Sequence, residues 1–244
     1  MQKVALFLLL GWFSSLALAE KAITFHIGEW PPYTSENILM HRLAEKLVEE
    51  SFASQGYKTL FEYHPWKRSF TNVKFGNADA TFPWYETDQR NKNFVISKEA
   101  LFRENQVFFY LKKKAFDWNT FEDLKKYQIG GTIGYNNVNL LEKNDIRVFV
   151  VSEESFNFRM LLAGRIDAYP AGALVGYEII HSLFTPEQAA LFTTHPKTLK
   201  EGDMHVLFSK KVKRAQEYAD AFDRGLLTLK SSGRYEEIMN SYMD

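Results

Sequence analysis

The chain has 244 residues, 45% of them hydrophobic and 16% aromatic, and its 30 basic residues balance its 30 acidic residues. This composition excludes a disordered or low-complexity chain and is sufficient for one or two substantial hydrophobic cores. A balanced charge is not typical of nucleic-acid-binding proteins, which present a basic face, so we expect no nucleic-acid partner. The absence of cysteine excludes disulfides, thiolate metal sites and cysteine catalysis.

The first nineteen residues have the pattern of a secretory signal peptide. Lys3 precedes an apolar run over residues 4–16, which is shorter than the roughly 20 residues that a membrane-spanning helix needs. A small-x-small cleavage motif occupies residues 17–19, so we expect cleavage after Ala19; an uncleaved membrane anchor is the alternative. The expected mature chain has no N-terminal cysteine for a lipid anchor, so we expect a freely soluble, periplasmic protein.

The first half of the mature chain alternates between strand and helix patterns. It predicts strands over residues 22–27, 60–63 and 78–83, a helix over residues 38–54 and a helix from Trp66 that ends at Gly76. A β-α-β-α-β order implies a mostly parallel sheet with right-handed crossovers. We therefore expect an α/β fold.

The second half continues with shorter elements. It predicts strands over residues 94–96, 106–111, 128–133, 147–151, 166–169 and 204–208, and helices over residues 120–126, 155–163, 185–188, 212–231 and 235–243. Ser152 or Ser155 is expected to cap the helix that runs through Ala163. The lysine-flanked runs 106–111 and 204–209 are interpreted as two crossings between lobes. The expected division is residues 20–105 plus 210–244 for lobe 1 and residues 106–209 for lobe 2.

One short pattern occurs twice and favours two similar lobes. The frame Gly-x-apolar-Asp-Ala begins at Gly76 and again at Gly164, each time between a helix pattern and a strand pattern. We expect Asp79 and Asp167 to hold backbone amides at these turns. The alternative is that the frame is only a common connection between a helix and a strand.

A candidate small-molecule site follows the strand over residues 78–83. Trp84, Tyr85 and Arg90 lie at its carboxyl end, where α/β sheets usually bind small molecules. Trp30 and Tyr33 flank two prolines in a loop after another strand, where a core aromatic is less expected. The alternatives are that Arg90 is a solvent-exposed loop residue and that the tryptophans are core residues.

The ordered set of motifs resembles family 3 of the bacterial periplasmic solute-binding proteins, the amino-acid-type receptors of ABC importers. The resemblance is carried by Glu29-Trp30-Pro31-Pro32-Tyr33, Gly76-x-x-Asp79-Ala80, Glu86-Thr87-Asp88-Gln89-Arg90, residues 94–97 with Leu101-Phe102, Gly131-x-x-Gly134, Gly164-x-x-Asp167-Ala168 and Gly233-x-Tyr235-x-x-Ile238-x-x-x-Tyr242. It implies a type II periplasmic-binding fold, with two lobes joined by two crossover strands that act as a hinge. It also implies a monomer without a cofactor, which captures a small carboxylate-bearing solute for a membrane permease or a sensor.

The resemblance also implies roles for particular residues. Arg90 matches the arginine that binds the ligand's carboxylate, and Trp30 and Trp66 match aromatics that enclose the ligand side chain. Asn136 and Asn137 fall near the position where the family has a small polar residue at the N-terminus of a helix. The backbone amides there can receive an anion. The candidate ligand-binding set is completed by Tyr33, Arg68, Trp84 and Tyr85. The alternative for Arg68 is a solvent-exposed position on its helix.

Two departures from the family pattern bear on the ligand. Pro83, with no amide hydrogen, stands among residues that are usually small and hydroxylated. Gly172 stands where these receptors have an aspartate for the ligand's ammonium group, and only Glu178 and Asp167 are nearby in the sequence. These differences favour a larger, flatter or aromatic carboxylate.

Catalytic motifs are not found in the sequence. The six histidines have no His-Glu-x-x-His spacing, and neither Gly-x-Ser-x-Gly nor a phosphate loop occurs. We therefore expect a binding protein and no enzyme. The alternatives are a dehydratase-type enzyme of the cyclohexadienyl dehydratase kind, acting through Glu29 or Glu178, and a ligand-sensing receptor domain without a transporter.

Overall fold

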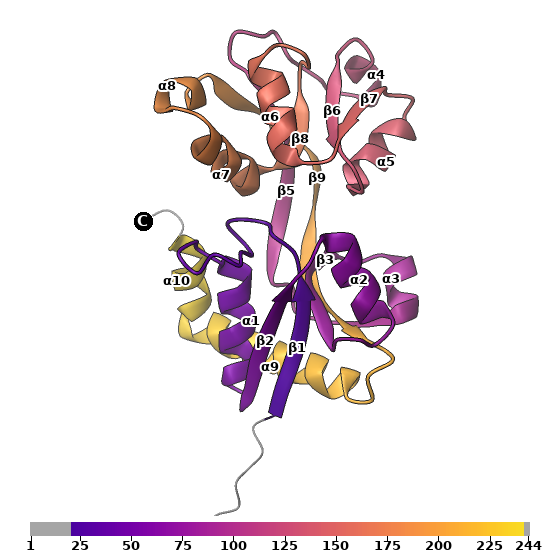
Figure 1. The fold of residues 1–244 in the computed structure, drawn as a ribbon, viewed down its shortest axis with the longest axis vertical. Helices are drawn as coiled ribbons and strands as arrows, with labels where there is room; N and C mark the ends of the chain where they lie inside the picture. Colours follow the sequence, from indigo (N-terminus) through magenta and orange to yellow (C-terminus); the bar gives the residue numbers. More distant parts are fainter. Residues whose placement is uncertain (1–20, 242–244) are drawn as a thin grey trace, which may run out of the picture.

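The computed structural model describes residues 21–241, so the expected signal peptide lies outside the described residues. Figure 1 shows two groups of elements, one above the other, with two long strands running between them. These strands are β5 (Phe102–Leu111) and β9 (Phe192–Ser209). The expectation of two α/β lobes joined by two crossover strands is confirmed.

The first lobe combines elements from both ends of the chain. It contains β1 (Lys21–Ile27), α1 (Leu43–Ala53), β2 (Tyr57–Tyr63), α2 (Trp66–Lys74), β3 (Ala80–Tyr85), α3 (Asp88–Asn93), β4 (Phe94–Ile96), α9 (Ala215–Ser232) and α10 (Arg234–Asn240). Strands β2, β1 and β3 are parallel, and β9 pairs antiparallel with both β3 and β4. Helices α1 and α9 cross so closely that a Cβ on Gly225 would lie 2.1 Å from the Ser51 carbonyl oxygen.

The second lobe is built from the middle of the chain. It contains α4 (Phe121–Leu124), β6 (Ile129–Thr132), α5 (Asn136–Glu142), β7 (Val148–Val151), α6 (Glu154–Leu162), β8 (Tyr169–Gly172), α7 (Ala173–Leu183) and α8 (Pro186–Ala189). Strands β6 and β7 are parallel, and a parallel bridge from Ile129 to Ala168 links β6 to the start of β8. Strand β8 pairs antiparallel with β5, so both long strands extend into this lobe.

Each lobe has its own aromatic core. In the first lobe Phe25 packs edge-on against Phe82, with 5.4 Å between ring centroids, and both side chains are fully buried. In the second lobe Phe158 packs against Phe109 and Tyr169, each at 5.3 Å. Aromatic pairs in these tilted arrangements stabilise each lobe beyond the area that they bury.

The repeated turn has the same structure in both lobes. Gly76 and Gly164 both adopt positive φ, 83° and 68°, which glycine tolerates best. The Asp79 carboxylate accepts a hydrogen bond from the Thr24 amide at 2.8 Å, and the Asp167 carboxylate accepts one from the Gln128 amide at 2.9 Å. The prediction that both aspartates hold backbone amides is confirmed.

Several predicted boundaries are wrong, and local backbone geometry gives the reasons. Helix α1 begins at Leu43, five residues later than expected, because Arg42 before it adopts a left-handed conformation with φ 53°. The Asn37 side chain also accepts from the Leu39 amide at 3.1 Å, and this turn competes with a helix. Helix α6 begins after Glu153, so neither Ser152 nor Ser155 is its N-cap.

Three strands also differ from expectation. Strand β3 continues through Trp84 to Tyr85, with a shift of register against β9 around Pro83. Strand β8 begins at Tyr169 and runs to Gly172, later than the predicted strand over residues 166–169. Strand β9 is 18 residues long because its two halves pair in different lobes. Among the described residues, no helix combines the length and the apolarity that a membrane crossing requires.

Candidate functional site

The loop between β1 and α1 carries Trp30 and Tyr33, and backbone contacts fix both rings. Trp30 and Thr34 exchange two backbone hydrogen bonds, of 2.9 and 3.1 Å, which close a tight turn. The Thr34 hydroxyl donates to the Gly28 carbonyl oxygen at 2.7 Å. The Trp30 and Tyr33 rings lie 4.9 Å apart, and buried Tyr33 stacks on Phe102 of β5 at 4.1 Å. The aromatic loop of the first lobe is therefore packed against a crossover strand.

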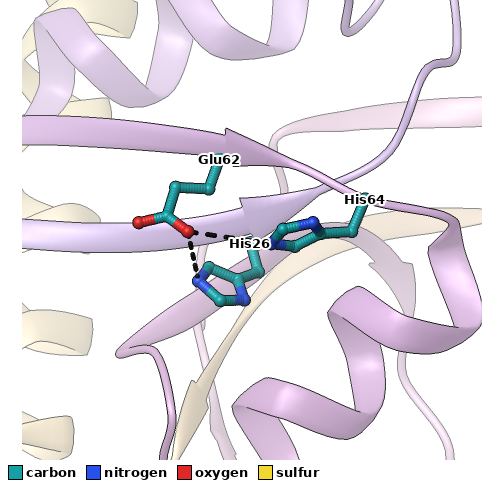
Figure 2. A group of neighbouring side chains, drawn as sticks. All are labelled: His26, Glu62 and His64. Atoms are coloured by element: carbon teal, nitrogen blue, oxygen red, sulfur yellow. Dashed lines mark ion pairs between the residues drawn. The ribbon is translucent and has the colours of Figure 1, made fainter.

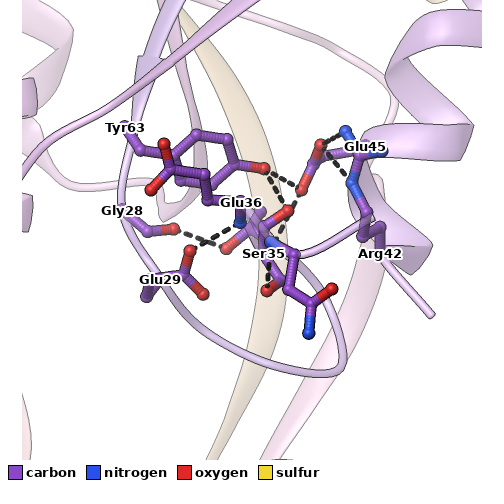
Figure 3. A network of polar contacts seen from close by, with 9 residues as sticks. Gly28, Glu29, Ser35, Glu36, Arg42, Glu45 and Tyr63 are labelled. Atoms are coloured by element: carbon purple, nitrogen blue, oxygen red, sulfur yellow. Dashed lines mark hydrogen bonds and ion pairs between the residues drawn. The ribbon is translucent and has the colours of Figure 1, made fainter. Parts of the chain in front are cut away.

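Buried Glu45 of α1 anchors the far side of this loop, as Figure 3 shows. Its carboxylate accepts hydrogen bonds from the Ser35 amide and from Arg42 Nε, both at 2.8 Å. The Tyr63 hydroxyl lies against the same carboxylate and 2.7 Å from the Ser35 carbonyl oxygen. A satisfied network of this kind makes the loop a rigid part of the first lobe.

Arg90, at the third position of α3, is held against aromatic rings. Its guanidinium lies over Trp84 at 4.8 Å and over Phe70 at 5.8 Å, and Nη1 donates to the Tyr85 carbonyl oxygen. Within the described part of the chain, no carboxylate forms an ion pair with this guanidinium. Burial lowers the pKa of Arg90 to about 10, because no anion compensates for the lost hydration.

Lys200 of β9 adds a second cation beside Arg90. Its ammonium nitrogen lies 3.9 Å from the centroid of the Tyr85 ring. Burial, and then the charge of Arg90, lower the pKa of Lys200. Two cations beside aromatic faces, with no described carboxylate between them, form a position where an anion would be stabilised.

A buried carboxylate lies close by, on crossover strand β5. Glu104 is 1% exposed, and its Oε1 is without a hydrogen-bond partner among the described residues. Burial raises the pKa of Glu104 to about 8. Burial, and then the charge of Glu104, raise the pKa of Tyr33 and Tyr85. The Tyr85 hydroxyl and Gln106 Oε1 are buried and likewise lack a described partner. Buried polar atoms without partners are uncommon, and in a binding protein a ligand is one way to satisfy them.

Glu104 fills the space beside Gly172 at the end of β8. A Cβ on Gly172 would lie 1.9 Å from Glu104 Oε1, so a side chain at position 172 would require this carboxylate to move. A carboxylate from β5 therefore lies beside Gly172, the position at which the resemblance led us to expect an aspartate.

A second carboxylate, Glu154, begins α6 in the second lobe. Burial raises the pKa of Glu154 to about 7, although hydrogen bonds from Tyr169 and Tyr135 oppose the shift. The Tyr169 hydroxyl lies 3.3 Å from Glu154 Oε1. The charge of Glu154 also raises the pKa of Glu104, so the two carboxylates are close enough to repel each other. The candidate site thus has a cationic part, at Arg90 and Lys200, and an acidic part, at Glu104 and Glu154.

The remaining predicted site residues are divided between this cluster and other places. Trp66 packs against Trp84 at 5.4 Å and donates from Nε1 to the Glu29 carbonyl oxygen at 3.1 Å. Arg68 is exposed, and its charge acts on His26 instead of joining Arg90. The structure therefore brings Trp66 to the aromatic cluster and leaves Arg68 outside it.

The two asparagines at the start of α5 do not converge on the cluster. Asn136 is exposed, whereas Asn137 is buried and donates to the Pro170 carbonyl oxygen at 3.0 Å. This bond ties α5 to β8, which is a structural role. Among the described residues, one group with metal-ligand geometry occurs, at His26, Glu62 and His64 on the first lobe.

Sequence reasoning missed Lys200, Glu104 and Glu154. Lys200 and Glu104 lie within long strands without a recognisable motif, and they reach the cluster because β9 and β5 cross from one lobe to the other. The departure at Gly172 was noted in the sequence, but it was interpreted as favouring a larger, flatter or aromatic carboxylate and did not lead to Glu104.

Comparisons with known proteins agree with this architecture. The family model of bacterial extracellular solute-binding proteins, family 3, matches residues 41–244. No curated protein sequence matches the chain closely enough to be reported.

Three solved structures have the same fold at low identity. An ancestral arginine-binding protein bound to arginine is 18% identical, with 91% of this chain and 98% of that chain covered and a TM-score of 0.75. A histidine kinase sensor domain similar to periplasmic binding proteins is 16% identical, with 89% and 95% covered and a TM-score of 0.75. The amino acid ABC transporter substrate-binding protein AbpA from Streptococcus pneumoniae is 14% identical, with 90% and 93% covered and a TM-score of 0.72. These matches confirm the type II periplasmic-binding fold, and the chain belongs to family 3 of the bacterial extracellular solute-binding proteins.

Proposed function

We propose that this protein captures a small solute that carries both a carboxylate and a cationic group, and that it releases the solute unchanged to an ABC-type importer. One observation carries the proposal. Arg90 and Lys200 have no described carboxylate partner, while Glu104, whose charge acts on the neighbouring Tyr85, has a buried oxygen without a partner among the described residues. A zwitterionic solute would satisfy both sides at once.

Binding would begin on the first lobe. Arg90 is already oriented by Trp84 and by the Tyr85 carbonyl oxygen, so little side-chain entropy is lost when a carboxylate pairs with it. Lys200 adds a second charge-assisted contact. Trp30 and Trp66 supply apolar surface for the remainder of the solute, which fits a flat or aromatic group.

The cationic end of the solute would face Glu104. An ammonium or guanidinium group lowers the free energy of the ionised carboxylate, so its arrival would release the proton that Glu104 holds below about pH 8. This assignment adds a cationic group to our expectation of a larger, flatter or aromatic carboxylate. It rests on a carboxylate from β5 in place of one at Gly172.

Closure of the lobes would complete the site. We assign residues 20–105 and 210–244 to the first lobe and residues 106–209 to the second, with β5 and β9 as the hinge. The solute shifts the population toward the closed state only if it contacts the closed state better. Glu154 and Tyr135, both on the second lobe, are the groups we expect to approach the solute on closure. A membrane permease would then recognise the closed form.

We further propose export through a signal peptide cleaved after Ala19, and action as a periplasmic monomer. A related role, in which the closed form is read by a sensor kinase instead of a permease, uses the same site. The fold likeness to a histidine kinase sensor domain supports that variant.

A second candidate function is favoured by one observation. Glu104, with a pKa of about 8, is largely protonated at neutral pH and can act as a general acid, as a dehydratase requires. Incubation of the protein with prephenate-like acids separates the two functions. A change in solute mass that disappears in Glu104→Gln indicates an enzyme, whereas an unchanged solute supports the binding protein.

Native mass spectrometry on the purified protein tests the proposed function. We expect one solute per chain, retained by the wild type and by Arg224→Ala but lost by Arg90→Ala. Arg224 is a suitable control because it is exposed on α9 and contacts Gln55 at 3.2 Å. A thermal-shift screen over amino acids, aromatic acids and small peptides identifies the class. A screen in which only uncharged solutes bind would contradict the proposal.

A further inference from the structure

A group of three potential metal ligands lies on the sheet of the first lobe, outside the proposed solute site. The parallel register of β1 and β2 places His26 directly beside Glu62, and His64 follows two residues later in the connection to α2. Figure 2 shows the three side chains directed toward one another. Their ligand atoms all lie within 4.8 Å of each other.

From this geometry we infer that His26, Glu62 and His64 bind a transition-metal ion, with Zn²⁺ as the ion that suits the donors best. Two imidazoles and one carboxylate form one of the ligand sets that zinc takes with three protein ligands and a water molecule. This site is independent of the proposed capture of a solute.

The distances allow a metal with a small rearrangement. His26 Nε2 lies 3.1 Å, and His64 Nε2 3.7 Å, from Glu62 Oε2. In a tetrahedral zinc site with bonds of about 2.0–2.1 Å, ligand atoms are separated by about 3.3–3.4 Å. The two imidazole nitrogens lie within 4.8 Å of each other, so His64 needs to move by at most about 1.4 Å to reach this separation. The His64 side chain is half-buried, and the residue lies just before Pro65 in the short connection between β2 and α2. A movement of this ring therefore does not disturb the core.

The surroundings of His26 hold its ring toward Glu62. The residue is 7% exposed, and its Nε2 lies 3.1 Å from Glu62 Oε2. His26 Nδ1 lies 3.1 Å from the Asn72 side-chain nitrogen. With the Asn72 amide turned by 180°, its oxygen accepts the Nδ1 hydrogen and leaves the Nε2 lone pair facing Glu62.

Solvent reaches the site at Glu62, whose side chain is 57% exposed, and to a smaller extent at His64. Glu62 is exposed on the outer face of β2, whereas His26 lies beneath it in the interior. An ion would enter past Glu62 and keep a water ligand on that side. Exposed Arg68 contributes a positive charge that opposes the ion, so we expect Arg68→Ala to increase metal affinity.

Isothermal titration of the tag-free, chelator-treated protein with Zn²⁺ tests this inference. We expect one equivalent to bind, with affinity reduced at least tenfold in His64→Asn and in Glu62→Gln. Asn72→Ala removes the hydrogen-bond partner of His26 but leaves all three metal ligands in place. We expect this variant to lose zinc affinity by about 10–100-fold. His181→Asn is the matched control, because it removes an exposed histidine from α7 in the other lobe.

Titration with Co²⁺ gives a second readout that does not depend on affinity alone. Tetrahedral Co²⁺ absorbs visible light strongly, so the wild type and His181→Asn should develop this band and His64→Asn should not. The inference is overturned if Zn²⁺ does not bind, or if His64→Asn and Glu62→Gln bind it as the wild type does. Circular dichroism of each variant confirms that it is folded.

Discussion

The guanidinium of Arg90 lies 4.8 Å over the indole ring of Trp84, and no described carboxylate pairs with it. An arginine used only for stability would normally be solvated or paired, because burial of an unpaired charge is costly. Here the aromatic face and one carbonyl oxygen hold it in a partly desolvated state. This relationship is the basis for assigning Arg90 to the carboxylate of a solute.

Replacement of Arg90 should therefore reduce affinity more than stability. We expect Arg90→Ala to weaken binding of a carboxylate solute at least tenfold, because one charge-assisted bidentate contact contributes about 1.5–3 kcal/mol. Arg90→Lys keeps the charge but loses the planar fork, so it should fall between the wild type and the alanine variant. Calorimetry measures both constants. Unchanged affinity in Arg90→Ala would remove this residue from the site.

Glu104 should make stability depend on pH in a defined direction. Its folded-state pKa of about 8 lies above the ordinary value of 4.5, so the wild type loses stability as pH rises from about 5 through 8. Glu104→Gln has no charge to bury and should escape this loss. The stability advantage of the variant should grow across this range, by an amount on the order of a few kcal/mol.

Urea denaturation at several pH values measures that difference. Glu49→Gln, exposed on α1, is the control, and its curve should follow the wild type. A difference between Glu104→Gln and the wild type that stays constant or shrinks as pH rises would contradict a buried, protonatable Glu104.

Glu45 should be essential for the loop that carries Trp30. Because Glu45→Ala leaves Arg42 and the Ser35 amide without this acceptor and removes one of the two acceptors of the Tyr63 hydroxyl, we expect a loss of about 3–5 kcal/mol in the free energy of unfolding. Chemical denaturation measures the loss. Glu49→Ala on the exposed face of the same helix should change stability by less than about 0.5 kcal/mol. Equal effects of the two variants would argue against the anchoring role.

The two aspartates of the repeated turn should contribute similar amounts to stability. Both accept a bond from a strand amide, but Asp167 also pairs with Lys114 at 3.1 Å. That pair is partly exposed and adds little, so each Asp→Ala change should cost about 1–3 kcal/mol through the lost amide bond. Lys114→Ala should be nearly neutral in thermal denaturation. If Lys114→Ala destabilised the protein as much as Asp167→Ala, the ion pair would be the dominant interaction.

The sequence predicted those features that depend on neighbouring residues. The turn glycines and the short helix predicted over residues 185–188 are local patterns, and they occur close to where they were expected. The late start of α1 was missed because it depends on one left-handed residue, Arg42, which no composition rule identifies.

The acidic half of the candidate site depends on contacts between distant segments. Glu104 and Gly172 are 68 positions apart in the numbering and meet because β5 and β8 pair antiparallel in the second lobe. A single sequence does not fix such a pairing. Lys200 reaches Tyr85 in the same way, through the long strand β9.

A crystal structure of the protein with its captured solute tests the central claim most directly. Our account predicts a single solute between the lobes, with its carboxylate hydrogen-bonded to Arg90, Lys200 close by and its cationic group facing Glu104. A solute bound elsewhere, or one that leaves Arg90 and Glu104 without a new partner, would contradict it.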